Sequence, residues 1–329
     1  MRLPTDRSRE QPSLPAELDD LLRTARADLA AGCWSDVREL LEGREREREE
    51  RPELDVYLAE AEMRMANARQ ARTLLVAAIP MLEQDAAGDV RRRAINLLGA
   101  AHFALGEYAE AEAVFARALE LAYAAGDLIA VARVMNNLGA IANVKGEGER
   151  ALGFYGLALP AYERLEVMLG QAETHHNIAI TYRDMRCYPQ AEHHERRALA
   201  LARDARDPRV EQMARVGLAE LALLRGNARG ADGEATRAAV ACASAPDPIG
   251  EADALRVVGE ARAAIGARDE ALDVLERAVA LARRHGHSLI ESEALRARAH
   301  LFAACGLDSA ARADAESARR LMGSETPDG

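Results

Sequence analysis

Four histidines and a cysteine lie close together near the middle of the chain, and their side chains are of the kinds that bind metal ions. They form two adjacent pairs, His175/His176 and His193/His194, with Cys187 between the pairs. Imidazole nitrogens and thiolates are good ligands for zinc or copper. Adjacent residues on a helix point about 100° apart, so neither pair can chelate an ion as residues four apart would. A metal-binding protein or enzyme is therefore the remote alternative, and surface or packing histidines are the simpler interpretation.

A second set of polar residues recurs at helical spacing and is suited to binding a peptide. Side chains three or four residues apart share one face of a helix. An amide both donates and accepts, so Asn can satisfy a peptide backbone, whereas Arg selects carboxylates. The alternative is that these are solvated residues, or that some of the asparagines bond to neighbouring helices. The candidate groove residues are Arg93, Asn96, Arg133, Asn136, Asn137, Asn143, His176, Asn177 and Arg183.

Charge changes along this candidate groove. Its first half is basic, which predicts a partner with an acidic segment, whereas acidic residues enter in the second half. These later residues are Glu220, Asp253, Glu260 and Glu293, against Arg256, Arg296 and His300. A partner with a matching charge gradient would be oriented by such a groove.

The common signatures of catalysis are missing from the sequence. It contains no G-x-x-x-x-G-K-[ST], no G-x-G-x-x-G after a strand, no H-E-x-x-H and no G-x-S-x-G. The sequence therefore predicts a protein that is not an enzyme, with no catalytic residue, no metal and no cofactor.

Composition and charge exclude several classes of protein. The net charge of −11 argues against nucleic acid as a partner, because phosphate contacts need clustered Lys and Arg. No stretch approaches the roughly 18 apolar residues of a membrane span, and the four cysteines lie far apart without a C-x-x-C pair. An Ala- and Arg-rich chain whose only lysine is Lys145 is typical of a GC-rich bacterial genome. We therefore expect a cytoplasmic protein that binds no membrane.

The helices that would position these side chains are predicted from small residues that recur every 40 positions, in sets that we call columns. One column contains only alanine, and a second alanine column follows seven residues later, from Ala78 to Ala318. A third column, from Ala59 through Gly99 and Gly139 to Ala299, contains only Gly or Ala. Such columns predict that two backbones approach closely at one place in each unit of a helical solenoid. The first column is Ala71, Ala111, Ala151, Ala191, Ala231, Ala271 and Ala311.

Each unit is predicted to be a helix, a tight turn and a second helix. Between Asp89 and Gly126, apolar residues recur at helical spacing, stop at Gly106 and resume at Tyr108. The turn needs a residue that tolerates positive φ, and Ala66 and Arg186 replace glycine there. Glycine holds this position at Gly106, Gly146, Gly226, Gly266 and Gly306.

Prolines support this division into units. Pro52, Pro208 and Pro248 fall where a first helix should begin, a position at which the missing N–H costs nothing. Pro80 and Pro160 lie inside second helices, and there they predict a bend or an early end.

The unit resembles the tetratricopeptide repeat, whose pattern is L-G, then G-x-Y, A, F and A at fixed offsets. The 40-residue period is similar to that of the long-repeat subgroup of Pins-type scaffolds, kinesin light chain and bacterial peptide-sensing regulators. The resemblance implies an all-α, right-handed superhelical solenoid of about eight helix-turn-helix hairpins. It also implies that first helices line a concave groove, where Asn137 and Asn177 match the Asn that often clamps a peptide backbone. The residues that carry the pattern are Leu98, Gly99, Gly106, Tyr108, Ala111, Phe115 and Ala118.

The chain is predicted to have four parts. Residues 1–13 form a disordered N-terminal segment, and residues 14–51 form a degenerate helical hairpin. Residues 52–322 form the repeat array, whose last hairpin has a polar face and acts as a cap. Residues 323–329 form a frayed tail.

The sequence predicts a non-enzymatic interaction module or adaptor that binds a peptide segment of a partner protein in the concave groove. The alternative is a regulatory protein whose superhelix responds to a peptide or metabolite. Self-association into a homo-oligomer stays open, because an exposed terminal hairpin can pair with its own copy.

Overall fold

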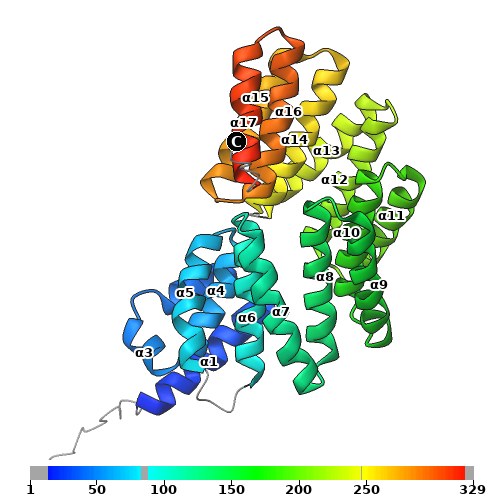
Figure 1. The fold of residues 1–329 in the computed structure, drawn as a ribbon. Coiled ribbons are helices and arrows are strands. Elements are labelled where there is room, and N and C mark those ends of the chain that lie inside the picture. The colour runs from blue at the N-terminus through cyan, green and yellow to red at the C-terminus, as the bar shows by residue number, and fades with distance from the viewer. Residues whose placement is uncertain (1–13, 83–87, 246, 323–329) are drawn as a thin grey trace, which may run out of the picture.

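A computed structural model describes residues 14–82, 88–245 and 247–322. Within these ranges the chain forms 17 α-helices and no strand, and consecutive helices pack as antiparallel hairpins (Figure 1). The predicted all-α solenoid of about eight hairpins is therefore confirmed. The disordered segment expected at 1–13 and the frayed tail expected at 323–329 lie outside the described residues. The helices are α1 (Leu14–Ala31), α2 (Trp34–Leu41), α3 (Glu45–Glu50), α4 (Glu53–Arg64), α5 (Ala68–Met81), α6 (Gly88–Ala104), α7 (Tyr108–Ala125), α8 (Leu128–Val144), α9 (Gly148–Arg164), α10 (Met168–Asp184), α11 (Tyr188–Asp204), α12 (Pro208–Leu224), α13 (Ala228–Ser244), α14 (Pro248–Ile265), α15 (Arg268–Arg284), α16 (Ser288–Ala304) and α17 (Asp308–Leu321).

The turns inside the hairpins have the backbone conformation that the sequence predicts. The five glycines of the turn column all have positive φ, from 75° at Gly306 to 90° at Gly266. Ala66 and Arg186, which replace glycine in this column, also have positive φ, 61° in both cases. Residues with a side chain rarely adopt this left-handed backbone conformation, so the backbone is strained at both positions.

The Gly/Ala column makes room for a large side chain of the following helix. A Cβ atom on Gly139 would lie 2.4 Å from the Tyr155 ring, and one on Gly99 would lie 2.6 Å from the Phe115 ring. Leu275 fills the same place opposite Gly259. The reason for the column is thus more specific than the expected approach of two backbones: glycine stands where an aromatic ring or a leucine packs onto the first helix.

The prolines act differently at different positions. Pro208 and Pro248 are the first residues of α12 and α14, and α4 begins directly after Pro52. Helix α5 ends one residue after Pro80, whereas α9 continues beyond Pro160 to Arg164.

The superhelix curves until its last hairpin touches its early hairpins. In Figure 1 the lower end of the α14–α17 group meets the upper end of the α4–α7 group, and α8–α13 form the arc between them. The Ser288 hydroxyl donates a hydrogen bond of 2.7 Å to the Leu105 carbonyl, and the Tyr108 hydroxyl lies 3.5 Å from the Met322 sulfur. We call this set of contacts the closing contact. Because of this contact, the first helices form a ring around a central space instead of an open groove.

No helix in the described ranges combines the length and the apolar character needed to cross a membrane.

Candidate functional site: the central cavity

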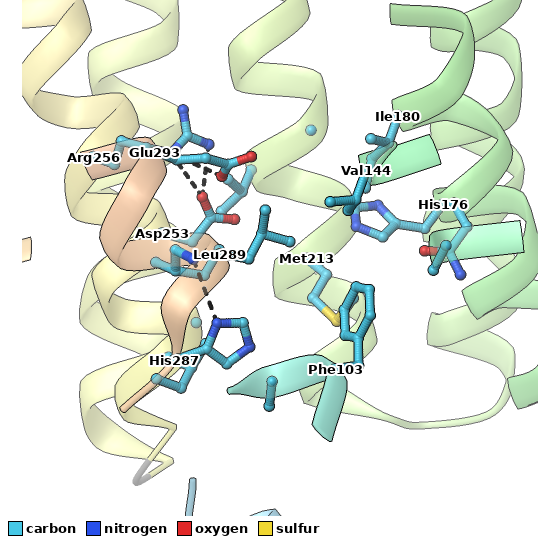
Figure 2. A pocket seen from close by; sticks show the side chains of 18 of the residues that line it. Phe103, Val144, His176, Ile180, Met213, Asp253, Arg256, His287, Leu289 and Glu293 are labelled. Atoms are coloured by element: carbon cyan, nitrogen blue, oxygen red, sulfur yellow. Dashed lines mark hydrogen bonds and ion pairs between the residues drawn. The ribbon is translucent and has the colours of Figure 1, made fainter. Parts of the chain in front are cut away.

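The first helices of the hairpins enclose a cavity of about 500 Å³, which we call the central cavity. Helices from α4 to α16 contribute to its wall, and Met322 contributes from the closing contact. Much of the lining is apolar, and several of these side chains point into the open space (Figure 2). The larger apolar residues are Met63, Phe103, Val144, Ile180, Met213, Val216, Ile249, Leu289, Ile290 and Met322.

One wall of the cavity carries a chain of ion pairs across four first helices. Arg183 of α10 binds Glu220 of α12, and Glu220 in turn binds Arg256 of α14. The Arg256 Nε donates to Asp253 over 3.0 Å and lies 3.7 Å from a carboxylate oxygen of Glu293 on α16. Charges of alternating sign therefore connect the first helices of four consecutive hairpins.

The carboxyl groups of this wall differ in their affinity for protons. Burial alone would raise the pKa of Glu220, but Arg183 and Arg256 outweigh it and lower that pKa to about 2. Burial raises the pKa of Glu293 to about 7, and the charges of Asp253 and Glu220 act in the same direction. Glu293 is therefore a group that exchanges a proton near neutral pH inside the cavity.

His176 lies on the opposite side of the cavity from Asp253 and Glu293, and its ring points into the open space (Figure 2). Its Nδ1 is 3.0 Å from a carboxylate oxygen of Glu195, and both side chains are buried. Burial lowers the pKa of His176, but the charge and hydrogen bond of Glu195 outweigh it and raise that pKa. A buried carboxylate thus fixes the orientation of an imidazole at the cavity wall.

Four of the nine groove residues predicted from the sequence line this cavity: Asn143, His176, Asn177 and Arg183. Arg93 lines a different pocket between α1, α4 and α6. Arg133 is exposed and lies outside the lining of either pocket.

The predicted asparagines bond to one another across neighbouring first helices. The Asn137 amide donates to Asn96 over 3.3 Å, and the Asn177 amide donates to Asn136 over 3.1 Å. Asn143 donates to the Asp184 carboxylate over 3.0 Å. Part of their hydrogen-bonding capacity therefore joins the helices, which is the alternative that the sequence left open.

Two features of the site could not be predicted from the sequence. His287 holds the N-cap place that Asp127, Asp207 and Asp247 hold in other units, and its Nδ1 accepts from the Ile290 N–H over 3.4 Å. Burial lowers the pKa of His287 to about 4, so its ring is neutral and able to accept. The closing contact gives no local signal, because it joins residues more than 180 positions apart.

Two other histidines of the predicted cluster, His175 and His194, pair with each other. The Nδ1 atoms of His175 and His194 are 2.8 Å apart, and burial lowers the pKa of His175 to about 4. His193 is exposed. In the described ranges, no group of three or more His, Cys, Asp or Glu side chains is arranged to hold a metal ion.

Comparison with known proteins agrees with this geometry. Residues 92–122 match the model of the tetratricopeptide repeat family. No curated protein is similar to the chain in sequence. A Rap protein complexed with competence and sporulation factor has a similar structure, with a TM-score of 0.61 and 17% identity over 94% of this chain and 96% of its own. The chain has a tetratricopeptide-type repeat fold.

Two further solved structures share this tetratricopeptide-type fold. The Rap conjugation gene regulator of the plasmid pLS20, in complex with the Phr* peptide, has a TM-score of 0.70 and 12% identity over 82% of this chain and 73% of its own. Aspartyl phosphate phosphatase F from Bacillus subtilis has a TM-score of 0.53 and 12% identity over 98% of this chain and 96% of its own.

One tetratricopeptide-type unit departs from the pattern of the others at the site. Glu195 stands where Phe115, Tyr155 and Leu275 stand in their units, so a carboxyl group replaces a core side chain. Gly217 leaves the space for it, since a Cβ atom there would meet the Glu195 carboxylate at 2.1 Å. In this unit, a carboxyl group therefore replaces an apolar core side chain, and it pairs with His176 at the cavity wall.

Proposed function

We propose that this protein is a non-enzymatic interaction protein that captures a short peptide in the central cavity. The observation that carries the proposal is the cavity itself, about 500 Å³ in volume and lined by first helices. Small-ligand sites typically have volumes of about 300 to 1,000 Å³, with apolar walls and a few fixed polar groups. Phe103, Met213 and Leu289 offer apolar contacts, and His176 and Glu293 offer polar groups on opposite sides (Figure 2).

A peptide-responsive regulator is favoured over a plain adaptor by the closing contact. Because α16 and the end of α17 touch the α6–α7 turn, a peptide in the central cavity lies inside a ring whose two ends are in contact. A short peptide that fits only one state of the ring shifts the balance between open and closed forms. The likeness to a Rap protein solved with competence and sporulation factor, and to a regulator solved with the Phr* peptide, supports the same proposal.

The acidic segment predicted for the partner stays a prediction. Arg183 already binds Glu220, and Arg93 binds Glu60, so two of the predicted arginines are ion-paired. Apolar side chains of the peptide have better support, because they match the larger part of the cavity lining.

The proposal is tested by affinity-selection mass spectrometry with a synthetic library of three- to six-residue peptides. The wild type is compared with Val144→Phe, which fills the cavity from the end of α8. The matched control is Val240→Phe, which makes the same change at a position that is 63% exposed on α13. We expect peptides retained by the wild type and by the Val240 variant to be lost with the Val144 variant. Retention of the same peptides by all three proteins would contradict the proposal.

Small-angle scattering separates the regulator from the adaptor. For a regulator, a selected peptide changes the maximum dimension of the particle, because the ring opens or tightens. For an adaptor, the peptide binds and the scattering envelope stays the same.

A further inference from the structure

A second pocket, of about 490 Å³, lies between α1, α4 and α6, near the N-terminal end of the array. We call it the arginine pocket, because Arg26, Arg64 and Arg93 line it from these three helices. Arg64 also lines the central cavity, so the two spaces meet at this residue.

Aromatic rings hold the three guanidinium groups in place. The Cζ atoms of Arg26 and Arg93 lie 6.0 and 5.7 Å from the centre of the Tyr57 ring. Arg26 also donates to the Tyr57 hydroxyl over 3.0 Å, and the Arg64 Cζ lies 5.5 Å from the Trp34 ring. A guanidinium that lies over an aromatic face keeps N–H groups at its edge for an anion. The aromatic contacts therefore fix three donors without neutralising their charge.

The positive charge of the pocket exceeds its negative charge. Arg93 binds the Glu60 carboxylate, and the other acidic lining residue, Asp89, binds Arg92. Neither Arg26 nor Arg64 forms an ion pair with any residue in the described ranges of the chain. Desolvation by the surrounding protein lowers the pKa of Arg64, and the nearby positive charge of Arg209 lowers it further. The charges of Glu173, Glu60 and Asp207 act on the Arg64 pKa in the opposite direction, from beyond ion-pair distance. Arg26 and Arg64 thus lie close to other cations, and within the described ranges no carboxylate is in direct contact with either guanidinium.

We propose that the arginine pocket binds a phosphate monoester group. A phosphate monoester carries a charge of about −1.5 to −2 at pH 7 and has three acceptor oxygens, which suits donors that arrive from three helices. A carboxylate is planar and carries a single charge, so it leaves part of the positive charge unmatched. Trp34 and Leu29 supply an apolar wall for the organic part of the ligand. This site is separate from the peptide proposed for the central cavity and does not depend on it.

The chain carries its own reporter for this site, because Trp34 is its single tryptophan. The full-length protein is titrated with phenyl phosphate and with inorganic phosphate at constant ionic strength, and Trp34 emission is followed. We expect a saturable change with both probes. Benzoate, which replaces the phosphate by a carboxylate, is expected to bind at least tenfold more weakly. Equal binding of benzoate and phenyl phosphate would overturn the phosphate assignment.

Two variants test whether the change in Trp34 emission comes from binding in the arginine pocket. Arg26→Gln and Arg64→Gln each remove one guanidinium and are expected to weaken phenyl phosphate binding about tenfold. The matched control, Arg23→Gln, removes the same charge from the exposed side of α1 and is expected to leave binding unchanged. Circular dichroism melting verifies that each variant is folded, and Arg64→Gln remains informative if the loss of the Tyr57 contact unfolds the Arg26 variant. The proposal is wrong if emission fails to saturate, or if both pocket variants bind as the wild type does.

Discussion

The hydroxyl of Ser288 and the carbonyl of Leu105 are joined by a 2.7 Å hydrogen bond that spans 183 positions of the chain. Ser288 begins the last hairpin and Leu105 lies in the turn between α6 and α7, and Gly106 lies beside both of them and beside the backbone of Leu321. The groove of this protein is therefore bounded by its own last hairpin.

Gly106→Ala is expected to open the ring. A Cβ atom there would lie 2.7 Å from the Leu321 carbonyl oxygen and 2.9 Å from the Ser288 Cβ. Gly146→Ala is a matched control, because Gly146 has the same φ of 78° and a Cβ atom there meets nothing within 4 Å. Both variants pay about 1 kcal/mol for the left-handed backbone. Only the Gly106 variant is expected to gain maximum dimension in small-angle scattering, and equal envelopes would show that the contact does not hold the ring.

Gly139→Ala is expected to lower the free energy of unfolding by about 1–3 kcal/mol, because the new methyl group overlaps the Tyr155 ring. Gly153→Ala is the control: it is also inside a helix, and a Cβ atom there meets nothing within 4 Å. It is expected to stabilise the protein by up to about 1 kcal/mol through helix propensity. Urea denaturation measures both. A neutral Gly139 variant would mean that Tyr155 has room to move.

Arg186→Gly is expected to raise the free energy of unfolding by about 1 kcal/mol, because glycine adopts a φ of 61° without steric cost. The Arg186 side chain is exposed, so its removal costs little packing. Ala66→Gly makes the same test in another unit, and thermal melting is the measurement. Loss of stability in both variants would show that the entropy of glycine in the unfolded chain outweighs the relief of strain.

Glu293 makes stability depend on pH. Its folded pKa of about 7 lies above its ordinary value of 4.5, so between these values the folded chain binds more protons than the unfolded chain. Its contribution to stability is therefore full below pH 4.5 and is lost as pH rises to 7. Glu293→Gln is expected to raise the free energy of unfolding at pH 8 by about 1–2 kcal/mol and to give little gain at pH 5.

Denaturation at the two pH values checks this expectation, with Glu120→Gln on the exposed face of α7 as the control. An equal effect of Glu293→Gln at pH 5 and pH 8 would show that the carboxyl group is not titrating in this range.

The sequence predicts those parts of the fold that depend on residues near in the chain. The positive φ at Ala66 and Arg186 follows from their place in a glycine column, and the helix starts at Pro208 and Pro248 follow from the chemistry of the first turn. The sequence predicts a change from basic to more acidic residues along the groove, but only the packed helices show that Arg183, Glu220, Arg256 and Glu293 meet as a chain of ion pairs.

The closing contact could not be predicted, because the curvature of a superhelix is the sum of small rotations at every interface between units. The arginine pocket could not be predicted from the sequence for a related reason. Arg26 belongs to the hairpin before the regular units, so no column of the 40-residue period links it to Arg64 or Arg93.

Closure also fixes the number of units. An open solenoid gains or loses one hairpin at moderate cost, since each unit contacts only its neighbours. Here, deleting or duplicating any 40-residue unit between α6 and α16 would carry Ser288 away from Leu105 and leave Tyr108 without Met322. Selection can therefore act on the number of repeats in this array. In proteins that evolve from it, insertions and deletions are expected in loops and not as whole repeats.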